Sequence, residues 1–239
     1  MKRINLWSGP RNISTAMMYS FAQRKDTTVF DEPLYAHYLS KTPAVEYHPG
    51  SQEVLDSQEH DGNKVMQMLM GNHSTEVVFI KQMAHHLIQL DWSFMDDCDN
   101  IILTRDPRDM LPSYNEQVNE PTLSDVGYDK QVEILCYLQS RQQKVIVLEA
   151  KQVLLNPRKV LTALCEQLEI PFDENMLRWE KGARKEDGVW AKYWYKSVHN
   201  STEFAPYKVK TTPFPKRLEP LYEACMPYYE QLEKLAIKA

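Results

Sequence analysis

IILTRDPRDMLPSY, at residues 101–114, passes from an apolar run into a charged turn and then into a helical pattern. The apolar run 101–104 predicts a buried strand. Arg105 then lies at the carboxyl end of this strand, where ligands bind in open α/β sheets, and Ser113 falls about two turns into the next helix. A guanidinium and a hydroxyl together can hold a terminal phosphate. The alternative is an Asp-Pro turn in which Arg105 is paired with a carboxylate.

Four more apolar runs of strand length occur along the chain, separated by helical patterns. These predicted strands are Ile4–Trp7, Thr28–Phe30, Val77–Ile80 and Val145–Leu148. The predicted helices cover residues 14–23, 132–138, 160–168 and 218–235. Continuous apolar strands are typical of sheets buried on both faces, and the alternation with helices implies crossover connections. The sequence therefore predicts a three-layer α/β fold with a central, mainly parallel sheet of about five strands flanked by helices.

The composition predicts one domain that spans residues 1–239. The chain is 43% hydrophobic and 26% charged, which is enough apolar material for one well-packed core. Its 28 basic and 33 acidic residues give a net charge of −5, so no basic field favours a nucleic-acid partner. No apolar run reaches the length of a signal peptide at the N-terminus or the ~20 residues of a membrane span. We therefore expect a soluble, cytoplasmic protein.

Cysteine spacing gives no sign of a metal site or a disulfide framework. Cys98, Cys136, Cys165 and Cys225 are scattered along the chain, without a Cys-x-x-Cys pair. We expect reduced thiols in or near the core, because a free cysteine behaves as a small hydrophobic residue.

Two segments, residues 40–63 and 180–215, carry aromatic side chains but no clear period. Long segments of this kind in a compact domain are more often lids or binding walls than linkers. We predict that they are loops that cover the active site.

A second polar segment, SGPRNIST at residues 8–15, stands between the first predicted strand and the first predicted helix. Free N–H groups at the helix start, the hydroxyls of Ser14 and Thr15, and the guanidinium of Arg11 can converge there on a phosphate or sulfate. The alternative is an ordinary capped helix with a solvated Arg11. The segment lacks the Gly-x-x-x-x-Gly-Lys-Ser/Thr pattern of ATP- and GTP-binding loops.

The segment from Pro10 to Thr15 is similar to the 5′-phosphosulfate loop of the sulfotransferases. The resemblance implies a P-loop-like fold. It also implies that Arg11, Ser14 and Thr15 hold the 5′-phosphosulfate of 3′-phosphoadenosine 5′-phosphosulfate (PAPS), while Asn12 and Ile13 contribute backbone groups. One position departs from the family pattern: Asn12-Ile13 stands where Ser-Gly is usual. A β-branched Ile13 does not readily adopt the positive φ that glycine allows.

Residues 101–114 look very like the 3′-phosphate motif of the same family. The resemblance implies that Arg105 and Ser113 contact the 3′-phosphate, which distinguishes PAPS from ATP. Arg184, in the segment WEKGARK at residues 179–185, loosely matches a late basic segment at the same phosphate, although a solvated charged loop is an equal alternative. We expect two anion sites at opposite ends of one sheet edge, to match the separated 5′ and 3′ charges of PAPS.

Three residues are candidates for the chemistry, which needs a base and positive charge at the sulfuryl oxygens. Glu32, after the second predicted strand, best matches the position of the glutamate base in some sulfotransferases; the alternative is a surface turn. Lys81 ends the third predicted strand, and Met83 stands where cytosolic-type members carry a histidine base. His85 is the second candidate base, although an ordinary surface or satisfied histidine on the next helix is the more common case. Arg11 or Lys81 would stabilise the sulfuryl oxygens.

The predicted function is sulfuryl transfer from PAPS to a hydroxyl or amine of a small-molecule acceptor. No ligand-spaced cluster of His, Cys and Asp is present in the sequence, so we expect no metal. Two alternatives stay open: a catalytically silent nucleotide-binding protein and a kinase-like P-loop protein, the second of which would need the missing Walker residues.

Overall fold

One sheet of five strands runs through the centre of the protein, with every pair of neighbouring strands parallel. The computed structural model describes residues 1–239. The strand order is β2-β3-β1-β4-β5. The strands are β1 (Lys2–Ser8), β2 (Thr27–Asp31), β3 (Val77–Met83), β4 (Asp99–Thr104) and β5 (Val145–Glu149). The prediction of a central parallel sheet of about five strands is confirmed, and the structure adds the strand order.

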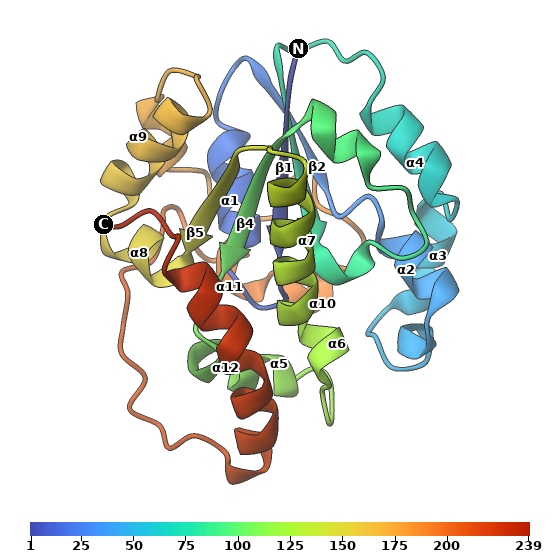
Figure 1. The fold of residues 1–239 in the computed structure, drawn as a ribbon, viewed down its shortest axis with the longest axis vertical. Coiled ribbons are helices and arrows are strands. Elements are labelled where there is room, and N and C mark those ends of the chain that lie inside the picture. Colours follow the sequence, from blue (N-terminus) through green and yellow to red (C-terminus); the bar gives the residue numbers. More distant parts are fainter.

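Helices cover both faces of the sheet. One face packs against α1 (Ser14–Phe21), α8 (Ala150–Leu155) and α9 (Pro157–Gln167). The other packs against α4 (Gly62–Leu69), α7 (Tyr128–Ser140) and α12 (Glu219–Glu233). Figure 1 looks onto this second face, with α7 and α12 in front of the strands. The three-layer α/β fold is therefore as predicted.

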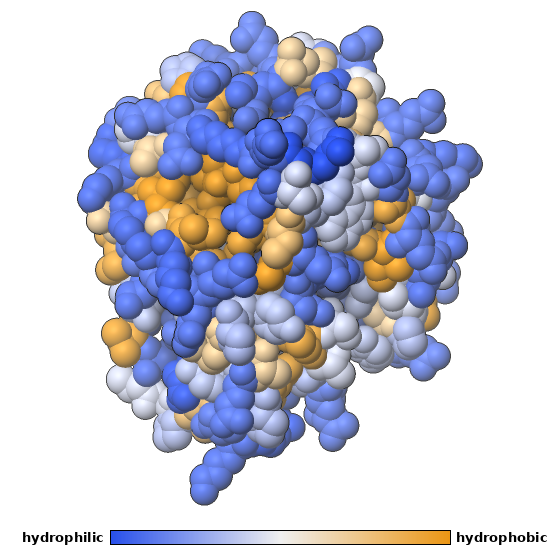
Figure 2. Space-filling model, viewed as in Figure 1, coloured by the Kyte–Doolittle hydropathy of each residue, from blue (hydrophilic) through white to orange (hydrophobic).

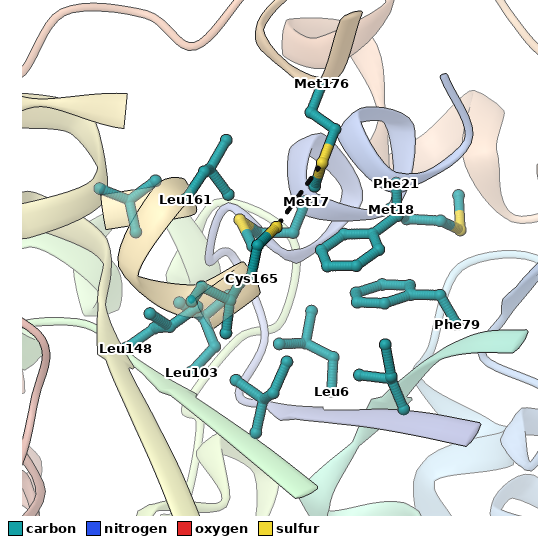
Figure 3. Packing of buried hydrophobic residues seen from close by; sticks show 14 of the residues in the cluster. Leu6, Met17, Met18, Phe21, Phe79, Leu103, Leu148, Leu161, Cys165 and Met176 are labelled. Atoms are coloured by element: carbon teal, nitrogen blue, oxygen red, sulfur yellow. Dashed lines mark hydrogen bonds between the residues drawn. The ribbon is translucent and has the colours of Figure 1, made fainter. Parts of the chain in front are cut away.

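The strand side chains alternate between two separate apolar clusters. Leu6 of β1 and Phe79 of β3 belong to the cluster under α1, whereas Trp7 and Ile80, each one residue later, belong to the cluster under α7. Figure 3 shows the first cluster, in which Phe21 of α1 stacks on Phe79 with ring centroids 4.1 Å apart. Because both faces are buried, each strand is apolar at consecutive positions rather than at alternate ones.

The outer surface differs from this core. Figure 2 shows the face of Figure 1 largely covered by polar side chains, with an apolar area on its left side, in the region where Figure 1 places β5 and α8. None of the helices combines the length and the apolar character that a bilayer span requires. All four cysteines are free thiols. Cys165 and Cys225 are buried and Cys98 is half-buried, but Cys136 is exposed on α7, so its predicted place in or near the core is wrong.

Several predicted boundaries are also wrong. Residues 40–63 are not one long loop, because they contain a 3-10 turn at Pro43–Glu46 and helix α3 (Ser51–Ser57). Residues 180–215 contain α10 (Ala191–Trp194) and α11 (Lys196–His199), each only one turn long. The first helix ends at Phe21 instead of residue 23.

The remaining elements connect the layers. They are α2 (Tyr35–Lys41), α5 (Pro107–Asn115) and α6 (Leu123–Val126), with 3-10 turns at Ala84–His86, Ser93–Asp97, Glu174–Leu177 and Lys216–Leu218. Pro107 begins α5 at the position where a missing N–H has no effect, and the Asp106 side chain accepts a hydrogen bond from the Arg108 N–H at 2.8 Å. This cap fixes the direction of α5 away from the end of β4.

Candidate active site

The loops that follow β1 and β4 touch each other, because these two strands are neighbours in the sheet. Arg11 Nε donates to Ser113 Oγ at 3.0 Å, and Arg105 Nη1 donates to the carbonyl oxygen of Arg11 at 2.8 Å. The expectation of two sites at opposite ends of the sheet edge is therefore wrong. The predicted phosphosulfate loop and the predicted 3′-phosphate residues form one continuous surface, at the edge where the strand order changes direction around β1.

The N-terminus of α1 carries no side-chain cap. The N–H groups of Ser14, Thr15 and Ala16 have no hydrogen-bond acceptor within the protein, whereas α5, α8 and α9 are all capped by side chains. The ordinary capped helix considered above is thus not what the structure has. Free N–H groups at the positive end of a helix favour an anion.

The backbone of this loop does not need a glycine at Ile13. Ile13 has φ −94° and ψ 18°, which a β-branched residue accepts readily. The left-handed residue is Arg11, with φ 49°. Asn12 holds the loop in place by donating from Nδ2 to the carbonyl oxygen of Leu103 at 3.0 Å. A non-glycine residue in this region is strained by roughly 1 kcal/mol or more, and such strain is often found at functional sites.

A cavity of about 370 Å³ opens between these loops and the segment that follows α11. We call it the cationic cavity, and its polar lining includes Arg11, Asn12, Thr15, Arg105, Ser113 and Lys210. Its volume lies in the usual range for small-molecule sites. One acidic residue, Glu203, is also part of the lining.

The three cations of this cavity form hydrogen bonds to uncharged groups only. Arg11 donates to Ser113 and to the carbonyl oxygen of Trp194, and Lys210 Nζ donates to the carbonyl oxygen of Asp109 at 2.6 Å. Burial lowers the pKa of both Arg11 and Lys210, and the charge of Arg105 lowers both further. Desolvated like charges repel each other, so the cavity favours an anion that neutralises them.

A buried ionic cluster lies beside this cavity, at the ends of β2 and β3. The sheet register pairs Asp31 with Lys81. Lys81 Nζ donates to Asp31 Oδ1 at 2.8 Å, to Tyr195 OH at 2.7 Å and to Glu32 Oε1. Tyr195 OH in turn donates to Asp31 at 2.8 Å and accepts from Trp190 Nε1 at 3.0 Å. The ammonium of Lys81 has three N–H donors, and all three are in use.

Glu32 has one carboxylate oxygen without a hydrogen-bond partner. Oε1 is bonded to Lys81, whereas Oε2 has no hydrogen-bond partner. Burial raises the pKa of the Glu32 carboxyl above its ordinary value; Lys81 opposes this shift and the charge of Asp31 adds to it. The backbone at Glu32 is left-handed, with φ 42°, and the residue is buried. It is therefore not the exposed surface turn that the sequence left open.

A second, smaller cavity of about 80 Å³ continues from Glu32 away from the cationic cavity. We call it the aromatic cavity, because rings form most of its wall beyond the loop of residues 10–15. Its lining includes Glu32, Tyr35, His48, Lys81, Met83, His85, His86, Tyr114, Trp190, Trp194 and Tyr195. Arg11, Asn12, Thr15, Trp194 and Tyr195 line both cavities, so the two spaces meet at the loop after β1.

The predicted residues thus fall into two groups and one exception. Arg11, Asn12, Ile13, Thr15, Arg105 and Ser113 line the cationic cavity, and Ser14, Glu32, Lys81 and His85 line the aromatic one. Arg184 lines neither cavity. Its guanidinium lies 4.7 Å from the ring centre of Tyr19.

His85 differs from its predicted surroundings. It lies in the short 3-10 turn Ala84–His86 and is buried, so it is neither on a longer helix nor at the surface. Burial, aided by the neighbouring His48, lowers its pKa to about 3.

Sequence reasoning assigned no role to Asp31, Tyr195 or Lys210. Tyr195 and Lys210 come from the segment 180–215, whose aromatic and basic residues follow no period. The only sequence signal for Asp31 is its place beside Glu32 at the end of a strand. No group of three or more His, Cys, Asp or Glu side chains is placed to hold a metal ion.

The fold and the site together define an α/β protein with a cavity lined by three cations at one edge of a parallel sheet. Comparison with known sequences assigns the class further: the family profile described as "Sulfotransferase domain" matches residues 1–236. The chain therefore belongs to the sulfotransferase domain family.

Two curated relatives from Arabidopsis thaliana are much longer than this chain. The branched-chain-amino-acid aminotransferase-like protein 1 is 39% identical over 231 residues, and the aminotransferase-like protein 2 is 37% identical over 235 residues. These matches cover 96% and 97% of the chain but only 41% of each relative.

Solved structures support the same fold. The sulfotransferase domain from the curacin biosynthetic pathway superposes with a TM-score of 0.58 at 17% identity, covering 94% of this chain and 97% of that one. The sulfotransferase domain of the Synechococcus PCC 7002 olefin synthase gives 0.55 at 17% identity, covering 93% of both chains. A sulfotransferase from Alicyclobacillus acidocaldarius gives 0.54 at 13% identity, covering 100% of this chain and 97% of its own.

Proposed function

We propose that this protein transfers the sulfuryl group of PAPS to a hydroxyl of a small acceptor. The observation that carries the proposal is the position of Arg11. Its guanidinium lines both the cationic cavity and the aromatic cavity that holds Glu32. A sulfuryl group held at Arg11 would therefore lie between the cavity for the anionic donor and the cavity for the acceptor.

The cationic cavity fits the charges of PAPS. The unpartnered N–H groups at the start of α1, together with Arg11, would hold the 5′-phosphosulfate. Arg105 and Ser113 would hold the 3′-phosphate, since the guanidinium of Arg105 is bonded only to a backbone carbonyl. The present contact between Arg11 and Ser113 would be replaced by contacts to the ligand. Lys210 adds a third cation to the same cavity.

Glu32 is the proposed general base. In the transfer, the acceptor oxygen forms a bond to sulfur as the bond from sulfur to the 5′-phosphate oxygen breaks, and the acceptor proton passes to Glu32 Oε2. The products are the sulfated acceptor and 3′-phosphoadenosine 5′-phosphate. A raised pKa suits Glu32 to this role, because a base works best when its pKa is near the working pH.

Lys81 and His85 receive other roles. Every N–H of the Lys81 ammonium is already bonded, so we assign the sulfuryl oxygens to Arg11 and treat Lys81 as a positioning residue for Glu32. A histidine with a pKa of about 3 is a weak proton acceptor, so His85 is assigned to the acceptor pocket.

Binding measurements test the donor assignment first. Calorimetry should give a Kd for 3′-phosphoadenosine 5′-phosphate at least about tenfold lower than for ADP, because charge-assisted hydrogen bonds to the 3′-phosphate are worth roughly 1.5–3 kcal/mol. Equal affinities, or tighter binding of ADP with magnesium, would reject a PAPS site in favour of a kinase-like one. A transfer assay with ³⁵S-labelled PAPS then separates an enzyme from a silent binder.

A further inference from the structure

The aromatic cavity contains an unusual concentration of buried polar atoms without partners. His48 Nε2, His86 Nδ1, Tyr114 OH and Trp194 Nε1 form no hydrogen bond within the protein, and all four residues line this cavity. His48, His86 and Tyr114 are each more than nine-tenths buried. An unpaired buried polar group lowers stability by about 1–3 kcal/mol, so a cluster of them favours a ligand that supplies the missing bonds.

The side chains at the far end of the same cavity carry no charge. At the near end, Lys81 is ion-paired with both Asp31 and Glu32. Burial lowers the pKa of His48 to about 4 and that of His86 well below its ordinary value, so both rings are neutral at pH 7. Asp125, which is bonded to Tyr47 and Thr122, does not line the cavity. A charged acceptor group at this end would lose its hydration without meeting an ionic partner in the cavity wall.

The walls are rigid and flat. Tyr114 lies against Trp194 with ring centroids 6.2 Å apart, and His86 is stacked between Tyr35 and Tyr38 at 5.0 and 4.6 Å. His48 is fixed by a 2.8 Å hydrogen bond between its Nδ1 and Tyr35 OH. Because these rings support one another, the cavity of about 80 Å³ selects for small acceptors.

We propose that the aromatic cavity binds a small, uncharged acceptor with at least two hydroxyl groups. One hydroxyl faces Glu32 and is sulfated, and a second bonds to the polar atoms of His48, Tyr114 and their neighbours. A hydroxyl suits these atoms because it both donates and accepts. The position of the reacting hydroxyl rests on the proposed function; the preference for a neutral diol rests on the cavity alone.

Four compounds built on one ring test the class directly. Phenol, catechol, 3,4-dihydroxybenzoate and dopamine would be titrated calorimetrically into the protein, with and without bound 3′-phosphoadenosine 5′-phosphate. Catechol should bind about fivefold more tightly than phenol, as expected for one added neutral hydrogen bond, and more tightly than both charged compounds. Equal affinities for phenol and catechol, tighter binding of a charged compound, or no binding of any of the four would overturn the proposal.

A single hydroxyl deletion locates the second contact. Tyr114→Phe should bring the catechol-to-phenol affinity ratio close to one without lowering Tm, since the deleted hydroxyl has no partner in the free protein. Tyr137→Phe, the same change on α7 outside the cavity, should leave the ratio unchanged. An unchanged ratio in Tyr114→Phe would contradict the assignment. If the protein did not prefer 3′-phosphoadenosine 5′-phosphate to ADP, that result would count against the proposed donor site. The titrations of phenol and catechol without nucleotide do not depend on that site.

Discussion

The cationic and aromatic cavities share the loop after β1, yet they treat charge in opposite ways. In the first, Arg11, Arg105 and Lys210 are bonded only to uncharged groups. In the second, Lys81 is paired with carboxylates and the histidines are neutral. The difference indicates that an anion completes the first space, whereas hydrogen bonds complete the uncharged far end of the second. Four substitutions test this difference between the cavities.

Glu32→Gln removes the only free carboxylate oxygen of the aromatic cavity while keeping the shape of the side chain. We expect the rate of sulfate transfer to fall by about 10²- to 10⁴-fold, the usual contribution of a general base. Binding of 3′-phosphoadenosine 5′-phosphate, measured by calorimetry, should not change. Glu53→Gln, at an exposed pair with Lys192, is the control and should keep full activity. Undiminished transfer by the Glu32 variant would remove Glu32 from the mechanism.

Lys81→Met tests whether the buried cluster is held together by its one cation. The change leaves Asp31 and Glu32 buried side by side without compensation, so we expect the free energy of unfolding in urea to fall by about 3–5 kcal/mol. Lys192→Met breaks an exposed pair and should alter stability by only about 0.5 kcal/mol or less. Similar losses in the two variants would contradict the view that Lys81 compensates the buried carboxylates.

Arg105→Ala tests the role of a cation that has no carboxylate partner in the cationic cavity. The Kd for 3′-phosphoadenosine 5′-phosphate should rise about 10- to 100-fold, because charge-assisted hydrogen bonds to one phosphate are lost, and the Kd for ADP should hardly change. Arg108 belongs to the same motif but is half exposed, and its guanidinium lies 4.5 Å from the ring centre of Tyr222. Arg108→Ala is therefore the matched control. An equal rise in Kd for both nucleotides would mean that Arg105 does not contact the 3′-phosphate.

The neutral histidines predict a pH dependence of stability. The pKa of His48 is lowered from 6.5 to about 4 by burial, so the unfolded chain binds a proton there before the folded one does. The free energy of unfolding should fall as the pH drops from about 6.5 towards 4, by at most about 1.4 kcal/mol per pH unit for this residue. Glu32, with its raised pKa, contributes with the opposite sign.

A difference measurement isolates the histidine. His48→Asn should show a shallower fall in unfolding free energy over this pH range than the natural sequence. The same slope in both proteins would show that the pKa of His48 is not lowered in the folded state. That result would contradict an uncharged far end of the aromatic cavity.

Much of the fold was predictable because parallel strands buried on both faces leave a strong local pattern. All five apolar runs are strands, and Arg105 and Glu32 follow their strands as predicted. The errors lie where the chain is short of local signal. Residues 40–63 contain helix α3 instead of being one long loop, and Arg184 stacks on Tyr19 away from both cavities.

The side chains that end each strand could be predicted from the sequence, because strand periodicity and the turn residues that follow it are local properties. Arg11, Glu32, Lys81 and Arg105 could therefore be placed at one edge of the sheet. The strand order, the contact between Arg11 and Ser113, and the contribution of Tyr195 to the ionic cluster depend on how the whole chain packs. Those contacts join residues about a hundred positions apart or more, and no spacing along the chain encodes them.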